Sequence, residues 1–477
     1  MKVLFVTSEI APWVKTGGLG DVAGALPPAL RQAGVDVRVL APYYPALQKD
    51  FPEHKAPIIA SLGSFGAHFS GSALREATAP DGTPLLLLDC HAYFSRPGNP
   101  YLGPEGHDWL DNHLRFGLLS RVGAWAGSDE CFLPWRPDIL HCNDWQAGLA
   151  PAYLQLLPGG RAHSLISVHN LAFQGLFGQQ ALHELGLPAG AWAMHGVEYY
   201  GHLSFLKAGL HYADFITTVS PTYANEIQTD AEGMGLSGLL RDRKGRLAGI
   251  LNGIDTTAWD PARDPHLAVP YSAKRLKAKA RNKAALQSEL GLAVRDDIPL
   301  LGVVSRLTHQ KGLDLVAAIQ QQIADLPAQL AVLGSGERKL EEAFHRIAEH
   351  HPGHFASRIG FNEGLAHRIE AGADIFLMPS RFEPCGLNQM YSLRYGTPPV
   401  VRATGGLADT VIDGVNGFTF AEPTAEALLG AIRRAVSAWH DKPTWKRLQT
   451  DGMARDVGWS NPASQYAAIY GKLLHPK

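Results

Sequence analysis

The 477-residue chain has few cysteines and almost no net charge. Its four cysteines include no C-x-x-C pair, so neither a zinc ribbon nor a disulfide framework is indicated, and the small number of cysteines fits a reducing compartment. The formal net charge of −2 at pH 7 disfavours a protein that binds nucleic acid polymers, because such proteins are usually basic. No apolar run approaches the ~18 residues of a membrane-spanning helix, and the apolar stretch after Lys2 is too short for a signal peptide. We therefore expect a cytoplasmic protein with no membrane partner.

Several motifs of common ligand sites are also missing. No G-x-x-x-x-G-K-S/T sequence occurs, and Gly17-Gly18-Leu19-Gly20 does not have the G-x-G-x-x-G spacing, so P-loop and dehydrogenase functions lose support. His183-Glu184 lacks the second histidine of H-E-x-x-H, and no group of His, Asp and Glu has the spacing of metal ligands. We expect neither a metal nor a cofactor.

The sequence instead has a regular alternation of short apolar runs with helix-length amphipathic stretches. In the first half, strands are expected at 3–6, 35–41, 85–89, 139–142, 165–168, 216–219 and 250–251, and helices at 22–31, 112–125, 147–156 and 203–212. In the second half, strands are expected at 300–305, 330–333, 358–361, 375–378 and 400–401, and helices from 313, from 337, at 365–371 and at 387–395. This alternation predicts α/β units whose parallel sheets are covered on both faces.

A change in composition separates the two halves. Residues 255–297 contain two Asp-Pro pairs and then a basic helical run, 274–283, which places a hinge near residues 250–300. The chain is also too long for one ordinary core. We predict two doubly wound, Rossmann-like domains, residues 1–250 and 251–456, followed by an amphipathic helix within 457–477.

The segment between the first strand and the first helix predicts an anion site. Gly17 and Gly18 let a ligand approach the backbone closely, and the N–H groups at the start of a helix favour negative charge. Lys15 adds a positive charge beside them, and Asp21 ends the segment. A plain glycine turn is the alternative, although a turn alone needs fewer glycines.

Loops in the second half follow expected strands in the same way. Arg306 and Lys311 lie within six residues of each other before a helix, where they could hold a diphosphate and stabilise charge on a phosphate leaving group. A solvated basic loop is the alternative. Glu383 precedes another helix, where a carboxylate could also serve only to complement the helix dipole. Because ligands bind outside the carboxyl ends of parallel strands, we expect these loops to converge on one cleft.

The string Lys-Thr-Gly-Gly-Leu-Gly-Asp at 15–21 resembles the N-terminal signature of the bacterial glycogen synthases and plant starch synthases. Matching segments occur in the family's order at 141–146, 167–170, 252–255, 305–312, 381–389 and 404–407, so the resemblance covers nearly the whole chain. It implies the α/β GT-B fold, in which two Rossmann-like domains face a deep interdomain cleft. It also implies a terminal helix that returns to the first domain.

The same resemblance implies roles for single residues. The catalytic residues would be His169, Glu383, Arg306 and Lys311, with the first two at the donor sugar. A lone histidine or an Asn-Gly turn is often merely structural, and this alternative stays open for His169 and Asn252. The residues expected to bind substrate are Lys15, Gly17, Gly18, Asp21, Tyr101, Asp144, Asn252, Phe361, Cys385, Gly386, Leu387, Thr404 and Gly405.

The reaction that the resemblance implies is retaining transfer of glucose from ADP-glucose to the 4-hydroxyl at the non-reducing end of an α-1,4-glucan such as glycogen. Two alternatives remain: another GT-B transferase, of the sucrose or phosphorylase type, and a non-catalytic protein that binds glycans or nucleotides. Two residues depart from the family's common pattern. Gln146 stands where a histidine is frequent, and Phe361 stands where a tyrosine often flanks the base. These departures affect the expected acceptor contacts and base affinity rather than the reaction class.

Overall fold

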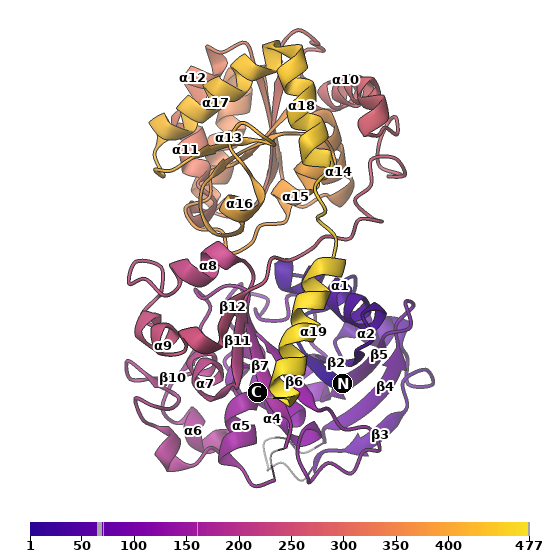
Figure 1. Ribbon diagram of the computed structural model, residues 1–477, viewed down its shortest axis with the longest axis vertical. Helices are drawn as coiled ribbons and strands as arrows, with labels where there is room; N and C mark the ends of the chain where they lie inside the picture. The colour runs from indigo at the N-terminus through magenta and orange to yellow at the C-terminus, as the bar shows by residue number, and fades with distance from the viewer. Residues whose placement is uncertain (64–68, 70, 160, 476–477) are drawn as a thin grey trace. The chain divides into compact units, whose positions relative to one another are not determined.

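The computed structural model describes residues 1–63, 69, 71–159 and 161–475, and the chain forms two compact units. Unit 1 consists of Met1–Asn252 and Trp459–Lys477, and unit 2 consists of Gly253–Gly458. The chain therefore leaves unit 1 and later returns to it, as the yellow terminal helix in Figure 1 shows. In the described part of the chain, no helix is long and apolar enough to cross a membrane.

Unit 1 is built on a nine-stranded sheet with the order β12-β11-β7-β6-β1-β2-β5-β4-β3. Its strands are β1 (Lys2–Val6), β2 (Asp36–Pro42), β3 (Ile58–Ser61), β4 (Ala73–Thr78), β5 (Pro84–Asp89), β6 (Ile139–Asn143), β7 (His163–Val168), β11 (Phe215–Thr218) and β12 (Leu247–Gly249). Strands β12 to β5 run parallel, whereas β4 and β3 pair antiparallel at one edge. A separate antiparallel sheet contains β8 (Leu176–Phe177), β10 (His202–Ser204) and β9 (Glu198–Tyr199).

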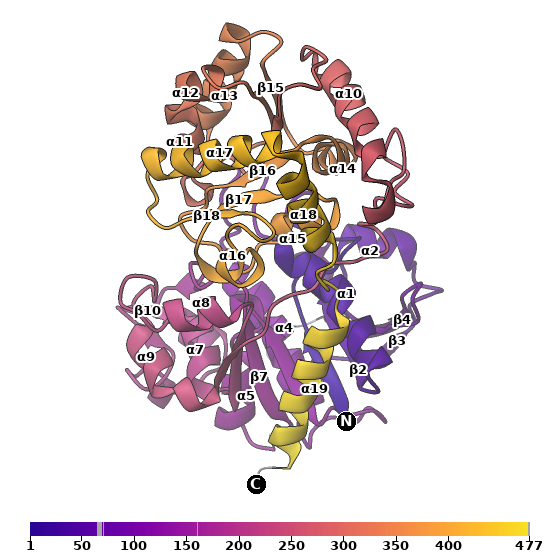
Figure 2. The same cartoon turned by 45° about the horizontal axis from the view of Figure 1, so that its top comes forward.

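The helices of unit 1 pack around this sheet. They are α1 (Gly18–Gln32), α2 (Pro45–Asp50), α3 (His91–Phe94), α4 (Asn112–Ala126), α5 (Ala150–Leu156), α6 (Ala181–Glu184), α7 (Phe205–Tyr212), α8 (Pro221–Glu226), α9 (Ser237–Asp242) and α19 (Ser460–Leu474), with short 3₁₀ helices η3 (Trp145–Ala147), η4 (Ala189–Ala191) and η5 (Lys244–Arg246). Helix α19 lies along α1 (Figure 2). Its Tyr470 hydroxyl lies 2.6 Å from Nδ1 of the buried His141 in β6, which ties α19 to the sheet.

Unit 2 contains a six-stranded parallel sheet with the order β15-β14-β13-β16-β17-β18. Its strands are β13 (Leu300–Val304), β14 (Gln329–Gly334), β15 (Phe355–Ile359), β16 (Ile375–Met378), β17 (Pro399–Arg402) and β18 (Phe418–Phe420). The helices are α10 (Lys279–Leu290), α11 (Leu313–Ala318), α12 (Gln320–Ala324), α13 (Arg338–His350), α14 (Glu363–Gly372), α15 (Asn388–Arg394), α16 (Gly405–Thr410), α17 (Ala425–His440) and α18 (Lys442–Met453), with 3₁₀ helices η6 (Ala273–Ala278) and η7 (His309–Lys311).

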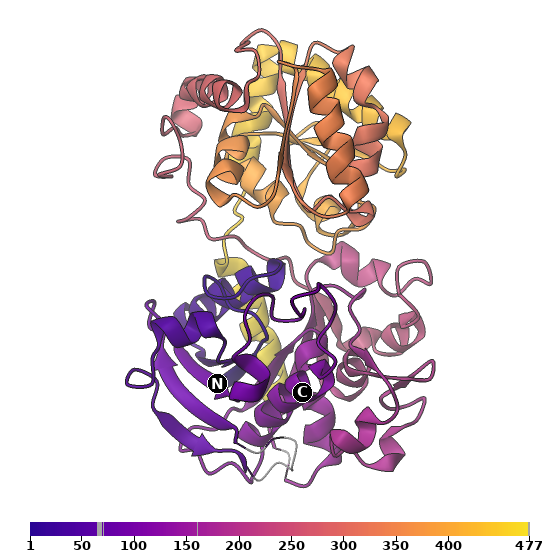
Figure 3. The same cartoon turned by 180° about the vertical axis from the view of Figure 1, so that it is seen from behind.

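The sheet of unit 2 has a core on each face (Figure 3). On one face, buried side chains of α11, α13, α17 and α18 pack on alternate strand residues, and on the other face α10, α14 and α16 do the same. Because both faces are covered, the strands are apolar at nearly every position, as is typical of a doubly wound sheet.

Several expected elements have other bounds in the structure. The helix expected at 147–156 begins at Ala150, after the 3₁₀ helix η3. The strand expected at 250–251 lies at Leu247–Gly249, because pairing with β11 joins Ile216 to Leu247. The helix expected at 203–212 is preceded by strand β10 and begins at Phe205. The strand expected at 358–361 is shifted to Phe355–Ile359, which leaves Phe361 in the loop that follows.

Candidate active site

The glycine loop of unit 1 connects β1 to α1. Helix α1 starts at Gly18, earlier than expected, and no side chain caps it. Gly17 and Gly18 are exposed, so the first N–H groups of the helix face an accessible surface. The Lys15 ammonium lies 2.7 Å from the Asp21 carboxylate, and the Lys15 side chain is 43% exposed. The structure therefore places Lys15, Gly17, Gly18 and Asp21 together at the end of β1.

Glu9 organises this loop and was missed in the sequence. Its side chain is buried, and its Oε2 accepts the Thr16 backbone N–H at 2.7 Å. Its Oε1 accepts the Thr16 hydroxyl at 2.5 Å and the Tyr101 hydroxyl at 2.6 Å. Glu9 thus joins Tyr101, from a distant segment, to the Lys15 loop. The only signal in the sequence is a carboxylate shortly after a buried strand, which by itself is not specific.

Asp144 and His169 follow the neighbouring strands β6 and β7. Asp144 has φ of 54°, a left-handed conformation that is unusual for a residue other than glycine and that often marks functional sites. Its Oδ1 accepts the His169 backbone N–H at 2.7 Å. Burial raises the pKa of Asp144 to about 7, and the hydrogen bonds from the backbone N–H groups of His169 and Asn170 only partly oppose this shift. Asp144 is therefore poised between its two protonation states at neutral pH.

The His169 ring is neutral at pH 7, because burial lowers its pKa to about 4. Its Nε2 lies 3.0 Å from Oδ1 of Asn143, whose amide nitrogen donates to the carbonyl of Val6 and so fixes the amide orientation. With Nε2 donating to Asn143, Nδ1 remains an acceptor. The ring can therefore accept a hydrogen bond from a hydroxyl without adding charge.

Two further polar side chains of unit 1 have unused acceptors. Asn252 and Gln146 are both buried, and neither Asn252 Oδ1 nor Gln146 Oε1 has a hydrogen-bond partner among the described residues. Gln146 lies in η3, directly after Asp144 and Trp145. By contrast, His141 in the same segment is fully buried between Tyr470 and Ser167, and it belongs to the core.

Lys311 and Glu383 form an ion pair in unit 2. Lys311 follows β13 and Glu383 follows β16, and their side chains meet at 2.5 Å with exposures of 18% and 7%. The Ser380 hydroxyl also donates to Glu383 Oε2, at 3.0 Å. Within the part of the chain that the structure describes, Glu383 Oε1 accepts no hydrogen bond. The ammonium keeps two further N–H donors, so each partner retains a group for a ligand.

The Thr404-Gly405 loop packs directly on Glu383. Gly405 has φ of 44°, and a Cβ placed there would lie 1.9 Å from the Glu383 carbonyl oxygen. The N–H of Gly406 donates to the same oxygen at 3.2 Å. The loops after β13, β16 and β17 therefore meet, and Thr404 and Gly405 lie beside the ion pair.

Arg306 and Arg381 have different roles in these loops. Arg306 is exposed, and among the residues that the structure describes its guanidinium bonds only to Gln310 Oε1, at 3.4 Å, and pairs with no carboxylate. Arg381 instead makes two bonds to Asp314, at 2.6 and 2.7 Å, and donates to the His309 carbonyl. Arg306 is thus available to an anion, whereas Arg381 holds two loops together.

The remaining predicted residues of unit 2 lie at loop ends. Cys385 is buried, Gly386 has φ of 73°, and Leu387 directly precedes α15. Phe361 is 85% exposed in the loop after β15. Across the described residues, no group of three or more His, Cys, Asp or Glu side chains is arranged to hold a metal ion.

Comparisons with known proteins place these loops in context. A sequence profile described as starch synthase catalytic domain matches residues 2–242, and one described as glycosyl transferases group 1 matches residues 291–449. A glycogen synthase of Dechloromonas aromatica is 57% identical over 98% of each chain. A glycogen synthase of Nitrosospira multiformis is 53% identical over 100% of this chain and 98% of its own length.

Solved structures show the same similarity. The catalytic domain of starch synthase IV from Arabidopsis thaliana, bound to ADP and acarbose, is 31% identical over 99% of both chains, with a TM-score of 0.87. A sucrose-phosphate synthase from Thermosynechococcus elongatus shares the fold, with a TM-score of 0.62 at 18% identity over 100% of this chain and 99% of its own.

Proposed function

The chain belongs to the glycogen and starch synthase family of GT-B glycosyltransferases, and from its residues we propose that it lengthens glycogen with glucose from ADP-glucose. The enzyme is a glycosyltransferase with glycogen synthase function. The proposal is more specific: ADP-glucose is the donor, the acceptor is the 4-hydroxyl at a non-reducing end, and the anomeric configuration is retained. All four cysteines are buried and none is in a disulfide, which supports a cytoplasmic location.

The Lys311–Glu383 pair carries this proposal. A donor sugar needs acceptors for its hydroxyls, and Glu383 has one carboxylate oxygen that is not used within the protein. A leaving diphosphate needs cations, and Lys311 keeps two donors while Arg306 has no carboxylate partner among the described side chains. One cluster of loops thus offers an acceptor to the sugar and cations to the phosphates.

In the reaction that we propose, the bond between the anomeric carbon and the diphosphate breaks while a bond to the acceptor oxygen forms on the same face. The proton of the acceptor hydroxyl passes to the leaving phosphate. Arg306 and Lys311 stabilise the negative charge that grows on the diphosphate, which lowers the barrier more than it tightens ground-state binding. His169, neutral and with Nδ1 free to accept, orients a sugar hydroxyl, and Asp144 with Tyr101 binds the acceptor.

Radiolabelled donors test the proposal directly. Incubation of the purified chain with glycogen and either ADP-glucose or UDP-glucose should give incorporation into polymer mainly from ADP-glucose, with release of ADP. Digestion of the product with an enzyme specific for α-1,4 ends should release the label. Equal use of UDP-glucose would overturn the donor assignment, and release of free glucose without polymer growth would overturn the acceptor assignment.

A further inference from the structure

Gln389, the second residue of α15, is a fully buried amide that the proposed reaction does not use. Its Nε2 donates to the carbonyl oxygens of Cys385 and Gly386, both at 3.0 Å. The same nitrogen lies 3.2 Å from the hydroxyl oxygen of Thr410, the last residue of α16. One side chain therefore joins the loop after β16 to the helix that follows β17.

The hydrogen bonds of its neighbours fix the orientation of this amide. An amide oxygen turned toward the carbonyls of Cys385 and Gly386 would meet two other acceptors, so the NH₂ group faces them. The Thr410 hydroxyl donates to the Gly406 carbonyl at 2.6 Å, which leaves its oxygen able to accept from Gln389. Because Gly406 is the second residue of α16, this chain of bonds reaches the first turn of that helix.

The backbone of Gly386 lies directly on the Gln389 side chain. Gly386 has φ of 73°, and a Cβ at this position would overlap the amide oxygen of Gln389. Gly386 and Leu387 are partly exposed, and neither donates its backbone N–H to an acceptor among the described residues. The Gly386 carbonyl is thus bound on the buried side of the loop, while two N–H groups are left for an anionic ligand.

We propose that Gln389 is a positioning residue, which holds the loops after β16 and β17 in the arrangement that binds the donor diphosphate. Since its side chain is fully buried, it acts through the Cys385 and Gly386 carbonyls. The inference rests on the proposed function, in which these loops meet the phosphates of ADP-glucose. Donors that are fixed in advance stabilise an anion without reorganisation, so loss of the amide should weaken phosphate binding and leave nucleoside binding unchanged.

The variant Gln389→Met tests this role in the full-length chain, because methionine has a similar size and no N–H to donate. Affinities are measured by calorimetry for ADP and for adenosine, which lacks both phosphates. We expect ADP binding to weaken about tenfold and adenosine binding to stay within about twofold of wild type. With ADP-glucose and glycogen, kcat should fall about tenfold while the KM for glycogen stays normal, because the same N–H groups meet the charge that grows on the leaving group.

Gln329→Met is the matched control. Gln329 is also fully buried in unit 2, and its Nε2 donates to two backbone carbonyls, those of Ala293 and Gly353, at 2.7 and 3.0 Å. It lies at the start of β14, the opposite end of that strand from the loops that carry the site. This variant should lower the melting temperature about as much as Gln389→Met does, with normal affinity for ADP.

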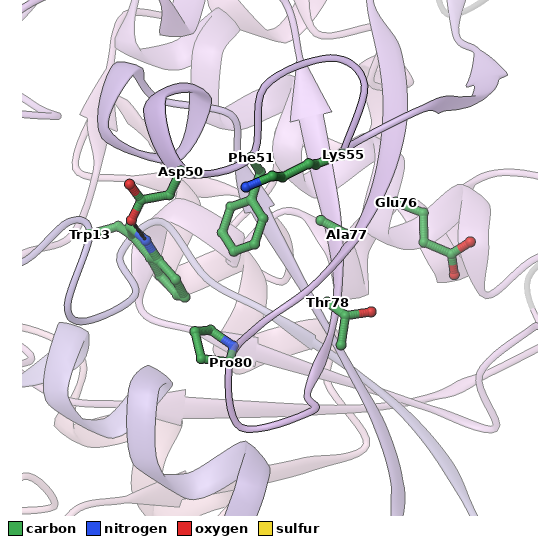
Figure 4. Close-up of a pocket in the computed structure, with 8 residues that line it drawn as sticks. All are labelled: Trp13, Asp50, Phe51, Lys55, Glu76, Ala77, Thr78 and Pro80. Atoms are coloured by element: carbon green, nitrogen blue, oxygen red, sulfur yellow. Dashed lines mark hydrogen bonds between the residues drawn. The ribbon is translucent and has the colours of Figure 1, made fainter.

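A second control concerns ADP that binds elsewhere on the chain. Unit 1 has a cavity of about 780 Å³, and its lining includes an aromatic ring and a cation, Trp13 and Lys55, which could hold a nucleotide (Figure 4). Trp13→Ala should leave the affinities for ADP and adenosine unchanged. A loss of ADP affinity in Trp13→Ala as large as that in Gln389→Met would overturn the assignment of this affinity to the loops of unit 2.

Equal losses of ADP and adenosine affinity in Gln389→Met would overturn the proposal, and so would a normal ADP affinity. If that variant does not fold, Thr410→Val decides, because it removes the hydroxyl that links Gln389 to Gly406. A selective loss of ADP affinity in Thr410→Val supports the proposal, and a normal one overturns it. The proposed function fails separately: a wild-type chain that binds ADP more tightly than adenosine but does not elongate glycogen contradicts that function alone.

Discussion

Glu383 is almost buried, and it uses only one of its two carboxylate oxygens within unit 2. Helix α15 begins five residues later, at Asn388, so Glu383 lies outside the first turn of that helix. Its bonds go to Lys311 and Ser380 rather than to helix N–H groups. This geometry disfavours the alternative that Glu383 only complements a helix dipole.

Glu383→Gln should therefore fold and yet be severely impaired in glucosyl transfer, because the amide keeps the shape of the side chain and removes its charge. Melting temperature and turnover are measured on one preparation. The matched control is Glu363→Gln, an exposed carboxylate in the first turn of α14, which should lose about 0.3–1 kcal/mol of stability with activity intact. A fully active Glu383→Gln enzyme would contradict the assignment of Glu383 to the sugar site. His169 would then be the main candidate for orienting the transferred glucose.

Lys311→Ala should lower kcat by roughly 10²-fold or more, because charge on the leaving diphosphate is larger in the transition state than in the ground state. Steady-state kinetics with varied donor concentration separate kcat from KM. Lys339→Ala, at an exposed position of α13, controls for the loss of a lysine in the same unit. A variant with normal kcat and only a raised donor KM would show that Lys311 merely binds the donor.

The raised pKa of Asp144 predicts how the stability of the folded chain depends on pH. The unfolded carboxyl loses its proton near pH 4, whereas burial raises the pKa of the folded carboxyl to about 7. Between these values the folded state holds more protons, so a rise in pH favours unfolding. Asp144→Asn cannot titrate, and the amide still offers an oxygen to the His169 N–H. We expect its stability relative to wild type to improve by on the order of 2–4 kcal/mol from pH 4 to pH 8 in denaturant titrations. A difference that does not change with pH would contradict this.

At the scale of elements, apolar runs predicted the central strands well because those strands are buried on both faces. Strand β16 has the expected bounds, Ile375–Met378. Strand β4, which lies next to the edge strand β3, was not predicted, since its buried Arg75 looks polar in the sequence and is stabilised by Asp89 of the neighbouring strand, 14 residues away. In the same way, the loops of the site could be located by their place after strands, but the role of Glu9 depends on contacts with Tyr101 that no local pattern contains.

The packing of one loop on another gives a prediction at this scale. Gly405→Ala would place a Cβ 1.9 Å from the Glu383 carbonyl oxygen, so the loops after β16 and β17 must separate and activity should fall at least tenfold. Gly414→Ala is the control, because its φ of 70° is equally unfavourable while nothing lies within 4 Å of the added Cβ. It should cost about 1 kcal/mol of stability with normal turnover. Equal activities for the two variants would show that the Gly405 contact does not matter for the site.

Taken over the whole molecule, charge is balanced, with 43 basic and 45 acidic side chains, so the cations at the donor site must act locally. Arg306 and Lys311 can supply the positive charge that a divalent cation supplies to phosphates in many other transferases. We expect glycogen elongation from ADP-glucose to proceed without added divalent cation and to survive EDTA, as measured by label incorporation. Activity that EDTA abolishes and Mg²⁺ or Mn²⁺ restores would contradict this.

The return of residues 459–477 to unit 1 also sets an order of events on the ribosome. Domains usually fold one after another as they emerge, the first before the second. Here His141 meets its partner Tyr470 only after 329 further positions have been synthesised, and all of unit 2 is made in between. Unit 2 can thus be complete while unit 1 still lacks α19. A nascent chain stalled anywhere in unit 2 therefore carries a first unit whose surface along α1 is not yet covered by α19.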